Sequence, residues 1–155
     1  MKITNIVAVL AFSLLGACMT AEPQMTPLEL QSMQTREYST NKDTVFASTM
    51  SVLQDLGYTV TSADKDTGLI AAESATGSSL GYAIFTGNTL TNQTRATAYI
   101  ERIKSKTVVR LNFVTKQETS SGWGQTNRSD KPILDVTIYQ NAFERIENAI
   151  FIRRN

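Results

Sequence analysis

In the segment KDTVFASTMSVLQDLGYTVTSADKDTGLIAA, residues 42–72, the hydrophobic period changes from that of a helix to that of a strand. In its first half, apolar side chains recur at helical spacing, and these are Phe46, Met50 and Leu53. Gly57 stands where a left-handed residue commonly ends a helix. We therefore predict a helix over residues 42–56, with its N-cap at Asn41 or Thr40.

The second half of this stretch has the composition of a β-hairpin. β-Branched and aromatic residues fill positions 58–61, and a returning strand is predicted over residues 69–72. Between them, residues 64–68 combine Asp with Gly, which is typical of a turn. A calcium loop that begins at Asp64 is the alternative. The EF-hand pattern requires Gly at position 6 and a carboxylate at position 12, whereas here Gly68 is at position 5 and Ala75 at position 12.

Further strands are predicted on both sides of this unit. Residues 34–40 contain the Thr and Tyr that favour a first strand. Residues 95–103 and 107–114 alternate between apolar and polar side chains, which predicts an antiparallel pair. The polar segment 117–131 is predicted to be a loop, and the composition of residues 75–93 does not distinguish a loop from a short helix.

The C-terminal segment predicts an amphipathic helix that begins at Asp135 and ends near Arg153. Its apolar residues lie on one helical face: Tyr139, Ala142, Phe143, Ile146, Ala149 and Ile150. Arg153 and Arg154 suit the negative end of the helix dipole. The whole pattern predicts an α+β fold, an antiparallel sheet of about five strands with two helices packed on one face, in the order β-α-β-β-β-β-α.

The N-terminal residues predict an export signal. One basic residue precedes an apolar run from Ile6 to Leu15, and the small residues Gly16 and Ala17 lead directly to Cys18. The run is shorter than the ~20 residues that a membrane span requires. Cys18 is the only cysteine, so it has no partner for an internal disulfide. We predict that residues 1–17 are a signal peptide.

Residues Leu15-Gly16-Ala17-Cys18 resemble the lipobox of bacterial lipoproteins. The resemblance implies that Cys18 becomes the first residue of the mature chain and carries three acyl chains, which makes membrane attachment effectively permanent. Met19 follows instead of the Asp that retains lipoproteins in the inner membrane of enterobacteria-like cells. The implied location is therefore the outer membrane, with the protein on its periplasmic face.

The segment after Cys18 is predicted to be a tether. Pro23 and Pro27 disfavour helix locally, and no hydrophobic period is sustained before residue 34. We therefore divide the chain into the signal peptide, the lipidated Cys and tether at residues 18–33, and a single α+β domain at residues 34–155.

Composition excludes several classes of function. The chain has 15 basic and 14 acidic residues, and one Lys is lost with the signal peptide. A neutral chain is not expected to bind nucleic acid, which requires a basic surface. The sequence has no His, so the commonest general base and the commonest metal ligand are both missing. We expect no metal, no cofactor and no enzymatic activity.

Five segments resemble a group of small, uncharacterised outer-membrane lipoproteins. They are residues 36–40, 52–58, 68–70, 139–143 and 149–151. More distantly, the helix-strand-turn-strand unit is similar to the helix-grip domains of BamC-like lipoproteins, which are accessory parts of the outer-membrane β-barrel assembly machine. The resemblance implies a helix-grip-like fold and a binding role, and it brings no catalytic residues.

Three aromatic residues are candidates for contact with a partner. Trp123 stands between two glycines in the polar segment 117–131, which suits an interface anchor; the alternative is a side chain folded back onto the sheet edge. Tyr82 and Phe85 belong to an apolar cluster in residues 80–85, which is either a docking patch or a part of the core.

We therefore expect a lipid-anchored periplasmic binding or scaffolding accessory at the outer membrane, attached through acyl chains on Cys18 and bound to an envelope protein. One alternative is a lipid or small-molecule binding module with its pocket between helix 135–152 and the sheet. A second alternative is an envelope hydrolase that uses carboxylates, for which Glu144 and Glu147 are the residues considered. Both lie on the polar face of the last helix, where charged side chains are normally solvated.

Overall fold

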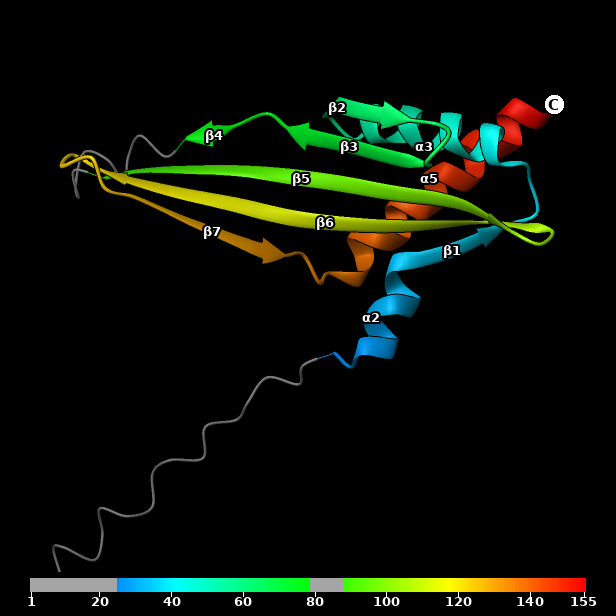
Figure 1. Ribbon diagram of the computed structural model, residues 1–155, viewed down its shortest axis with the longest axis horizontal. Coiled ribbons are helices and arrows are strands. Elements are labelled where there is room, and N and C mark those ends of the chain that lie inside the picture. The colour runs from blue at the N-terminus through cyan, green and yellow to red at the C-terminus, as the bar shows by residue number, and fades with distance from the viewer. Residues whose placement is uncertain (1–24, 79–87) are drawn as a thin grey trace, which may run out of the picture.

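The computed structural model describes residues 25–78 and 88–155 (Figure 1). Cys18, Tyr82 and Phe85 lie outside the described residues. The described helices and strands are α2 (Pro27–Gln34), β1 (Thr35–Tyr38), α3 (Lys42–Asp55), β2 (Tyr58–Asp64), β3 (Leu69–Ser74), β4 (Gly77–Ser78), β5 (Asn88–Ile103), β6 (Lys106–Ser121), β7 (Thr126–Pro132) and α5 (Val136–Arg154).

The strands form one antiparallel sheet, and α3 and α5 pack on one of its faces (Figure 1). Five strands follow one another in the order β1-β6-β5-β3-β2, while β4 pairs only with β5 and β7 only with β6. The predicted α+β fold, with two helices on one face of an antiparallel sheet of about five strands, is confirmed. Strands β4 and β7 were not predicted.

The predicted ends of both long helices are confirmed. The side chain of Asn41 caps α3, because its Oδ1 accepts a hydrogen bond from the Thr44 amide at 2.8 Å. After α3, Gly57 has a φ of 86°, the left-handed conformation expected of a helix-ending glycine. Asp135 caps α5 in the same way, since its Oδ1 accepts from the Thr137 amide at 2.9 Å.

The turn between β2 and β3 packs directly against β5. The Asp64 carboxylate accepts a hydrogen bond from the Asp66 amide at 2.9 Å, so it serves the turn itself, as the turn prediction requires. Gly68 follows with a φ of 83°, and its carbonyl accepts from the Ile100 amide at 2.8 Å. A Cβ atom at Gly68 would lie 1.9 Å from the Ile100 carbonyl oxygen, so no other residue fits there.

The core lies between the two helices and the sheet, and Tyr139 of α5 is at its centre. Tyr139 is fully buried, with its ring 5.1 Å from that of Phe113 in an edge-on arrangement. Its hydroxyl accepts a hydrogen bond from the Phe113 amide at 3.3 Å and donates to the Ile133 carbonyl at 3.0 Å. The other large side chains buried around it are Val45, Leu53, Ile70, Ile100, Val109, Leu111 and Ile146.

The predicted loop at residues 117–131 is wrong. Residues 117–121 continue β6, and β7 pairs with β6 from Val114↔Pro132 to Ser120↔Thr126. Strand β5 likewise begins at Asn88 instead of residue 95. The error has a physical cause: these strands lie beyond the helices, and polar side chains occupy both of their faces. They therefore lack the apolar alternation by which strands are recognised, although Thr suits extended backbone.

The predicted tether is wrong where it overlaps α2. Pro27 is the first residue of this helix, a position where its missing amide hydrogen is not needed. Thr26 and Glu29 form a capping box, in which the Thr26 amide donates to the Glu29 carboxylate at 2.8 Å. The helix then leads directly into β1, and Gln34 at its end is buried. The folded domain therefore begins before residue 34.

Replacing Gly68 by Ala is predicted to destabilise the protein by about 2–5 kcal/mol, because left-handed strain and a backbone clash with Ile100 add together. Gly57→Ala is the matched control, since Gly57 has a similar φ but no atom within 4 Å of a Cβ. It is expected to lose only about 1–2 kcal/mol. Urea denaturation measures both values, and equal losses would contradict the close packing of the turn.

Tyr139→Phe is predicted to lower the free energy of unfolding by about 1–3 kcal/mol, because it leaves the buried Phe113 amide without an acceptor. Tyr99→Phe is the control, because it removes a tyrosine hydroxyl from a residue that is 41% exposed on the other face of the sheet. That control is expected to change stability by less than about 0.5 kcal/mol. Similar effects of the two variants in urea denaturation would count against the bridging role of the Tyr139 hydroxyl.

Candidate functional site

One end of the sheet extends beyond the helices as an arm (Figure 1). We define the arm as β4, residues 88–95 of β5, residues 114–121 of β6, and β7. The last pair of buried core residues along β5 and β6 is Ala96↔Phe113. From Val114 to Ser121 every residue of β6 is only half-buried. The described part of the arm therefore has no hydrophobic core of its own.

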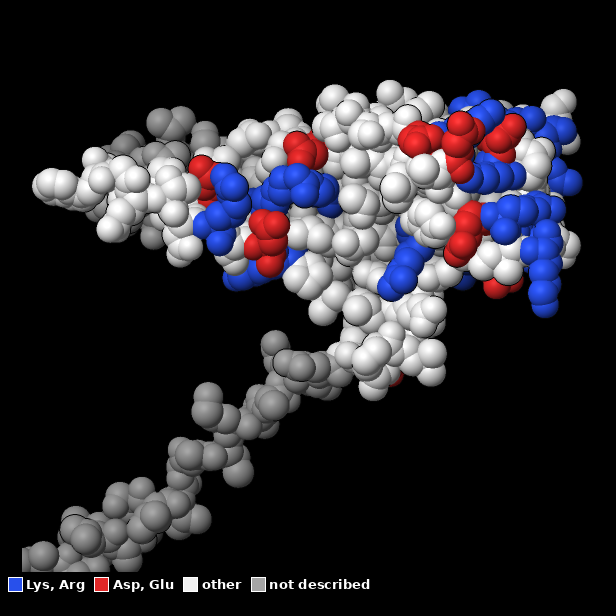
Figure 2. Space-filling model, in the orientation of Figure 1, with Lys and Arg blue, Asp and Glu red and all other residues white. Residues whose placement is uncertain are grey.

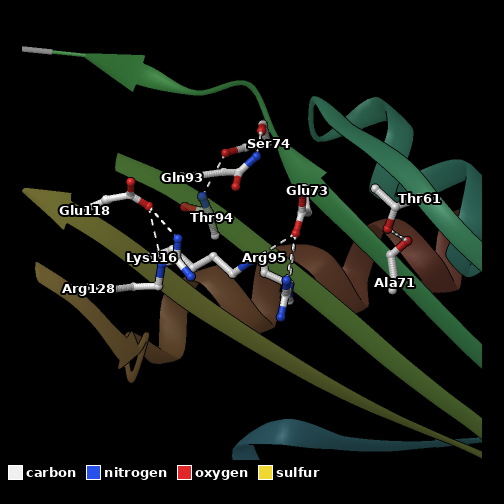
Figure 3. A network of polar contacts seen from close by, with 10 residues as sticks. All are labelled: Thr61, Ala71, Glu73, Ser74, Gln93, Thr94, Arg95, Lys116, Glu118 and Arg128. Atoms are coloured by element: carbon white, nitrogen blue, oxygen red, sulfur yellow. Dashed lines mark hydrogen bonds and ion pairs between the residues drawn. The ribbon is translucent and has the colours of Figure 1, made fainter. Parts of the chain in front are cut away.

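Ion pairs hold the base of the arm on the helix-free face of the sheet (Figure 3). Glu73 of β3 accepts from Arg95 Nη2 at 3.0 Å and from Lys116 Nζ at 3.2 Å, so one carboxylate joins three strands. Nearer the tip, Arg128 Nη2 of β7 lies 2.9 Å from Glu118 Oε2 of β6. The backbone ladder and these pairs take the place of apolar packing, which this part of the sheet lacks.

The pKa of Glu73 reflects this arrangement. The hydrogen bond from Arg95, followed by that from Lys116, lowers the pKa of the Glu73 carboxyl below its ordinary value. The carboxylate of Glu118 in turn raises the pKa of the Arg128 guanidinium. The ionised forms of Glu73 and Arg128 are therefore both favoured.

The tip of the arm is a tight turn that carries Trp123. The Gly124 amide donates to the Ser121 carbonyl at 3.0 Å, and the Ser121 amide donates to the Gln125 carbonyl at 2.9 Å. Gly124 has a φ of 79°, as a three-residue hairpin loop with a glycine bulge requires. Trp123 is 95% exposed, so the alternative in which it folds back onto the sheet edge is wrong. The turn fixes the backbone and leaves the indole ring in solvent.

A depression of ≈ 440 Å³ lies beside this turn. The described residues that line it are Thr119, Ser121, Gln125, Thr126 and Asn127. All five side chains are uncharged and end in a hydroxyl or an amide group. In Figure 2 the far end of the arm shows neither basic nor acidic described residues, and the charged side chains begin further along it. Trp123 was predicted from its type and its flanking glycines, whereas these five residues were not predicted, because they come together only when β6 and β7 pair.

A larger depression, of ≈ 550 Å³, lies between α2 and the start of α5. It is lined by Met25, Glu29, Ser32, Met33, Arg36, Val136 and Gln140. A pocket was predicted between helix 135–152 and the sheet, but among the described residues Tyr139, Phe143 and Ile146 are buried there as part of the core. Arg36, which lines the depression, has its guanidinium carbon 5.3 Å from the centre of the Phe143 ring.

The carboxylates considered for hydrolysis, Glu144 and Glu147, are exposed on α5. A different pair shares a depression of ≈ 330 Å³ on the helix-free face: Glu37 and Glu101 stand on either side of Val108. Their backbones are two strand spacings apart, about 10 Å. Glu37 is exposed and Glu101 only half-buried. The arrangement lacks the burial by which a general acid is usually kept protonated.

The described residues contain no cluster of three or more His, Cys, Asp or Glu side chains that fits a metal ion. Within the same part of the chain, no helix is both long and apolar enough to span a bilayer. Comparison with protein-family models gives no match, and a search of curated proteins finds no significant match either.

Folding lowers the pKa of the Glu73 carboxyl, so the ionised carboxylate stabilises the folded state. This stabilisation is fully present above the pKa that Glu73 has in the unfolded chain. It is lost as the pH falls through the lower pKa of the folded state. We predict that Glu73→Gln lowers the melting temperature at pH 7 and that the difference from the wild type disappears in acid. The matched control is Glu118→Gln, whose carboxylate bonds one basic side chain instead of two. Thermal unfolding monitored between pH 7 and pH 3 tests this, and a difference that does not change with pH would contradict it.

Proposed function

We propose that the protein is a lipid-anchored binding or scaffolding accessory on the periplasmic face of the outer membrane, without catalytic activity. The acyl chains on Cys18 attach it to the membrane, and the arm holds another component of the envelope. The observation that carries this proposal is Trp123, 95% exposed at the end of the arm on a turn whose backbone is fixed by hydrogen bonds. An envelope protein is the partner that the sequence analysis favours.

An exposed Trp at this place suits binding for two reasons. Trp is enriched among the residues that contribute most to interfaces, since one side chain buries a large area on association. The hydrogen-bonded turn also restricts the backbone before any partner arrives, so less conformational entropy is lost when the indole ring is buried.

The arm also has the properties of an element that serves contact more than folding. It lies beyond the pair Ala96↔Phe113, so the buried core is complete without it. Strand spacing places its tip about 25 Å beyond that pair, given about 3.3 Å for each of the eight residues from Val114 to Ser121. A scaffold of this shape reaches a partner at a distance from the domain.

A lipid or small-molecule binding module is the second candidate, and the depression between α2 and α5 favours it. Met25, Met33 and Val136 supply apolar surface there, and Arg36 supplies a cation for an anionic head group. A carboxylate hydrolase is the weaker alternative, because the paired carboxylates Glu37 and Glu101 lie on a solvated sheet face.

We predict that a photoreactive phenylalanine derivative in place of Trp123 captures one reproducible envelope component when the intact lipoprotein is irradiated in living cells. The matched control carries the same residue in place of Tyr99, which is exposed on the helix-free face away from the arm. Adducts are compared by mass after purification from the membrane fraction.

A second control, Cys18→Ala, is expected to leave the membrane fraction and to lose the adduct. Equal capture at Trp123 and Tyr99 would mean that the arm is not the contact. If Cys18→Ala still attached normally to the membrane, the proposal that acyl chains on Cys18 anchor the protein would be wrong.

A further inference from the structure

We propose that the end of the arm binds a glycan, a neutral chain of sugar rings such as the polysaccharide strand of the cell wall. This inference rests on the proposed function, because it names the chemical class of the envelope component that the arm holds. The candidate site consists of Trp123 and the depression beside it.

The lining of the depression has the chemistry of hydroxyl recognition. Thr119 and Thr126 offer hydroxyl groups, each of which both donates and accepts hydrogen bonds. The Ser121 hydroxyl already donates to the Gln125 carbonyl and accepts from the Gln125 amide, so it has only one lone pair left for a ligand. Gln125 and Asn127 offer side-chain amides, each with two donor hydrogens and an acceptor oxygen. Sugar hydroxyls and acetamido groups also both donate and accept, so the two sets are complementary. None of these five residues is charged, so an anionic polymer finds no cation in the described lining.

Trp123 supplies the second part of the site. Its indole ring is almost fully exposed and is attached to the same turn that places Ser121 and Gln125 at the depression. The face of an aromatic ring carries partial negative charge and attracts the polarised C–H groups on the flat side of a sugar ring. Polar side chains that fix hydroxyls beside one stacking aromatic form a site suited to a hexose unit.

The sheet continues the site along the arm. Residues Thr115, Gln117 and Thr119 alternate on β6 and lie on the same face as the core residue Phe113. Across the ladder, Gln117 pairs with Ser129 and Thr119 pairs with Asn127. This face carries mainly hydroxyl and amide groups, together with Lys131 opposite Thr115 and Leu90 opposite Thr119. Lys116, Glu118 and Arg128 lie on the other face. A linear chain of sugars fits a row of hydroxyl and amide groups better than a single small ligand does.

A protein partner is less well matched to the same surface. The cores of protein interfaces are rich in apolar and aromatic side chains around their anchors. Among the described residues, Trp123 is the only large hydrophobic side chain of the arm that is exposed. The remaining exposed apolar residues belong to other parts of the domain: Leu28, Leu69, Tyr99, Ile103, Leu134, Val136, Ile138, Phe151 and Ile152.

The experiment uses the full lipoprotein in detergent and two glycan probes. The first is chitotetraose, a soluble neutral tetramer of N-acetylglucosamine, and the second is cell-wall sacculi freed of attached protein. Trp123 is the only tryptophan in the sequence, so intrinsic indole fluorescence reports directly on the tip of the arm. We expect a saturable blue shift with chitotetraose and co-sedimentation with sacculi that chitotetraose reverses.

Three tip variants and one control make the result specific. Trp123→Ala is expected to weaken binding to sacculi by about tenfold or more, while Trp123→Phe retains part of it through stacking. Asn127→Leu removes an amide from the lining and is expected to weaken binding without moving the fluorescence of the free protein. Arg128→Gln changes the opposite face of β7 and is expected to bind as the wild type does. Melting temperatures establish that all four variants are folded.

The outcomes distinguish the glycan site from the proposed accessory function. Sacculi binding that is unchanged in Trp123→Ala, or an absence of any fluorescence change with chitotetraose, overturns the glycan site. If the photoreactive residue at position 123 then captures a single envelope protein, the accessory function stands and its partner is a protein. If it captures nothing and sacculi do not bind, both the glycan site and the proposed contact are wrong.

Discussion

The hydroxyl group of Tyr139 joins the two parts of the molecule. Along the outer edge of β6, residues 107–110 pair with β1 and residues 114–120 pair with β7. Between these two partners the Phe113 amide donates to the Tyr139 hydroxyl, and the Ile133 amide donates to the Phe113 carbonyl. A side chain of α5 therefore satisfies a strand edge at the point where the helices end and the arm begins. Strands β5 and β6 run through both parts, and this contact adds a link between α5 and β6 at their junction.

The two parts are stabilised by different physical means. The core half buries aliphatic and aromatic side chains against α3 and α5, so its stability comes mainly from the hydrophobic effect. The arm has a backbone ladder and partly exposed ion pairs such as Glu73 with Arg95 and Lys116, and pairs of this kind contribute little individually. Segments with few buried apolar contacts open locally at lower free energy than the core. The surface offered to a partner thus belongs to the less stable part of the sheet, which is common for binding elements.

The sequence predicted the core half of the fold because each of its elements has a local signal. Asn41, Gly57 and Asp135 mark helix ends by capping chemistry, and the buried faces of α3 and α5 follow helical periodicity. The arm had no such signal, since a strand with polar side chains on both faces has no apolar period, and the pairing of β5 with β6 joins residues distant in sequence. Trp123 was recognised as a candidate by its type and its flanking glycines. The lining of the depression beside it arises only when β6 and β7 pair, so composition alone did not reveal it.

The double-sided exposure of the arm also restricts how its length can change during evolution. Side chains in a strand alternate between faces, so one inserted residue would move every following side chain to the opposite face. Such a shift would separate Glu118 from Arg128 and would turn Thr119 away from Asn127. Paired insertions of two residues in β5, β6 and β7 preserve both faces and lengthen the arm by about 7 Å at each step. Homologous chains are therefore expected to carry arms whose lengths differ by even numbers of residues, with the core unchanged.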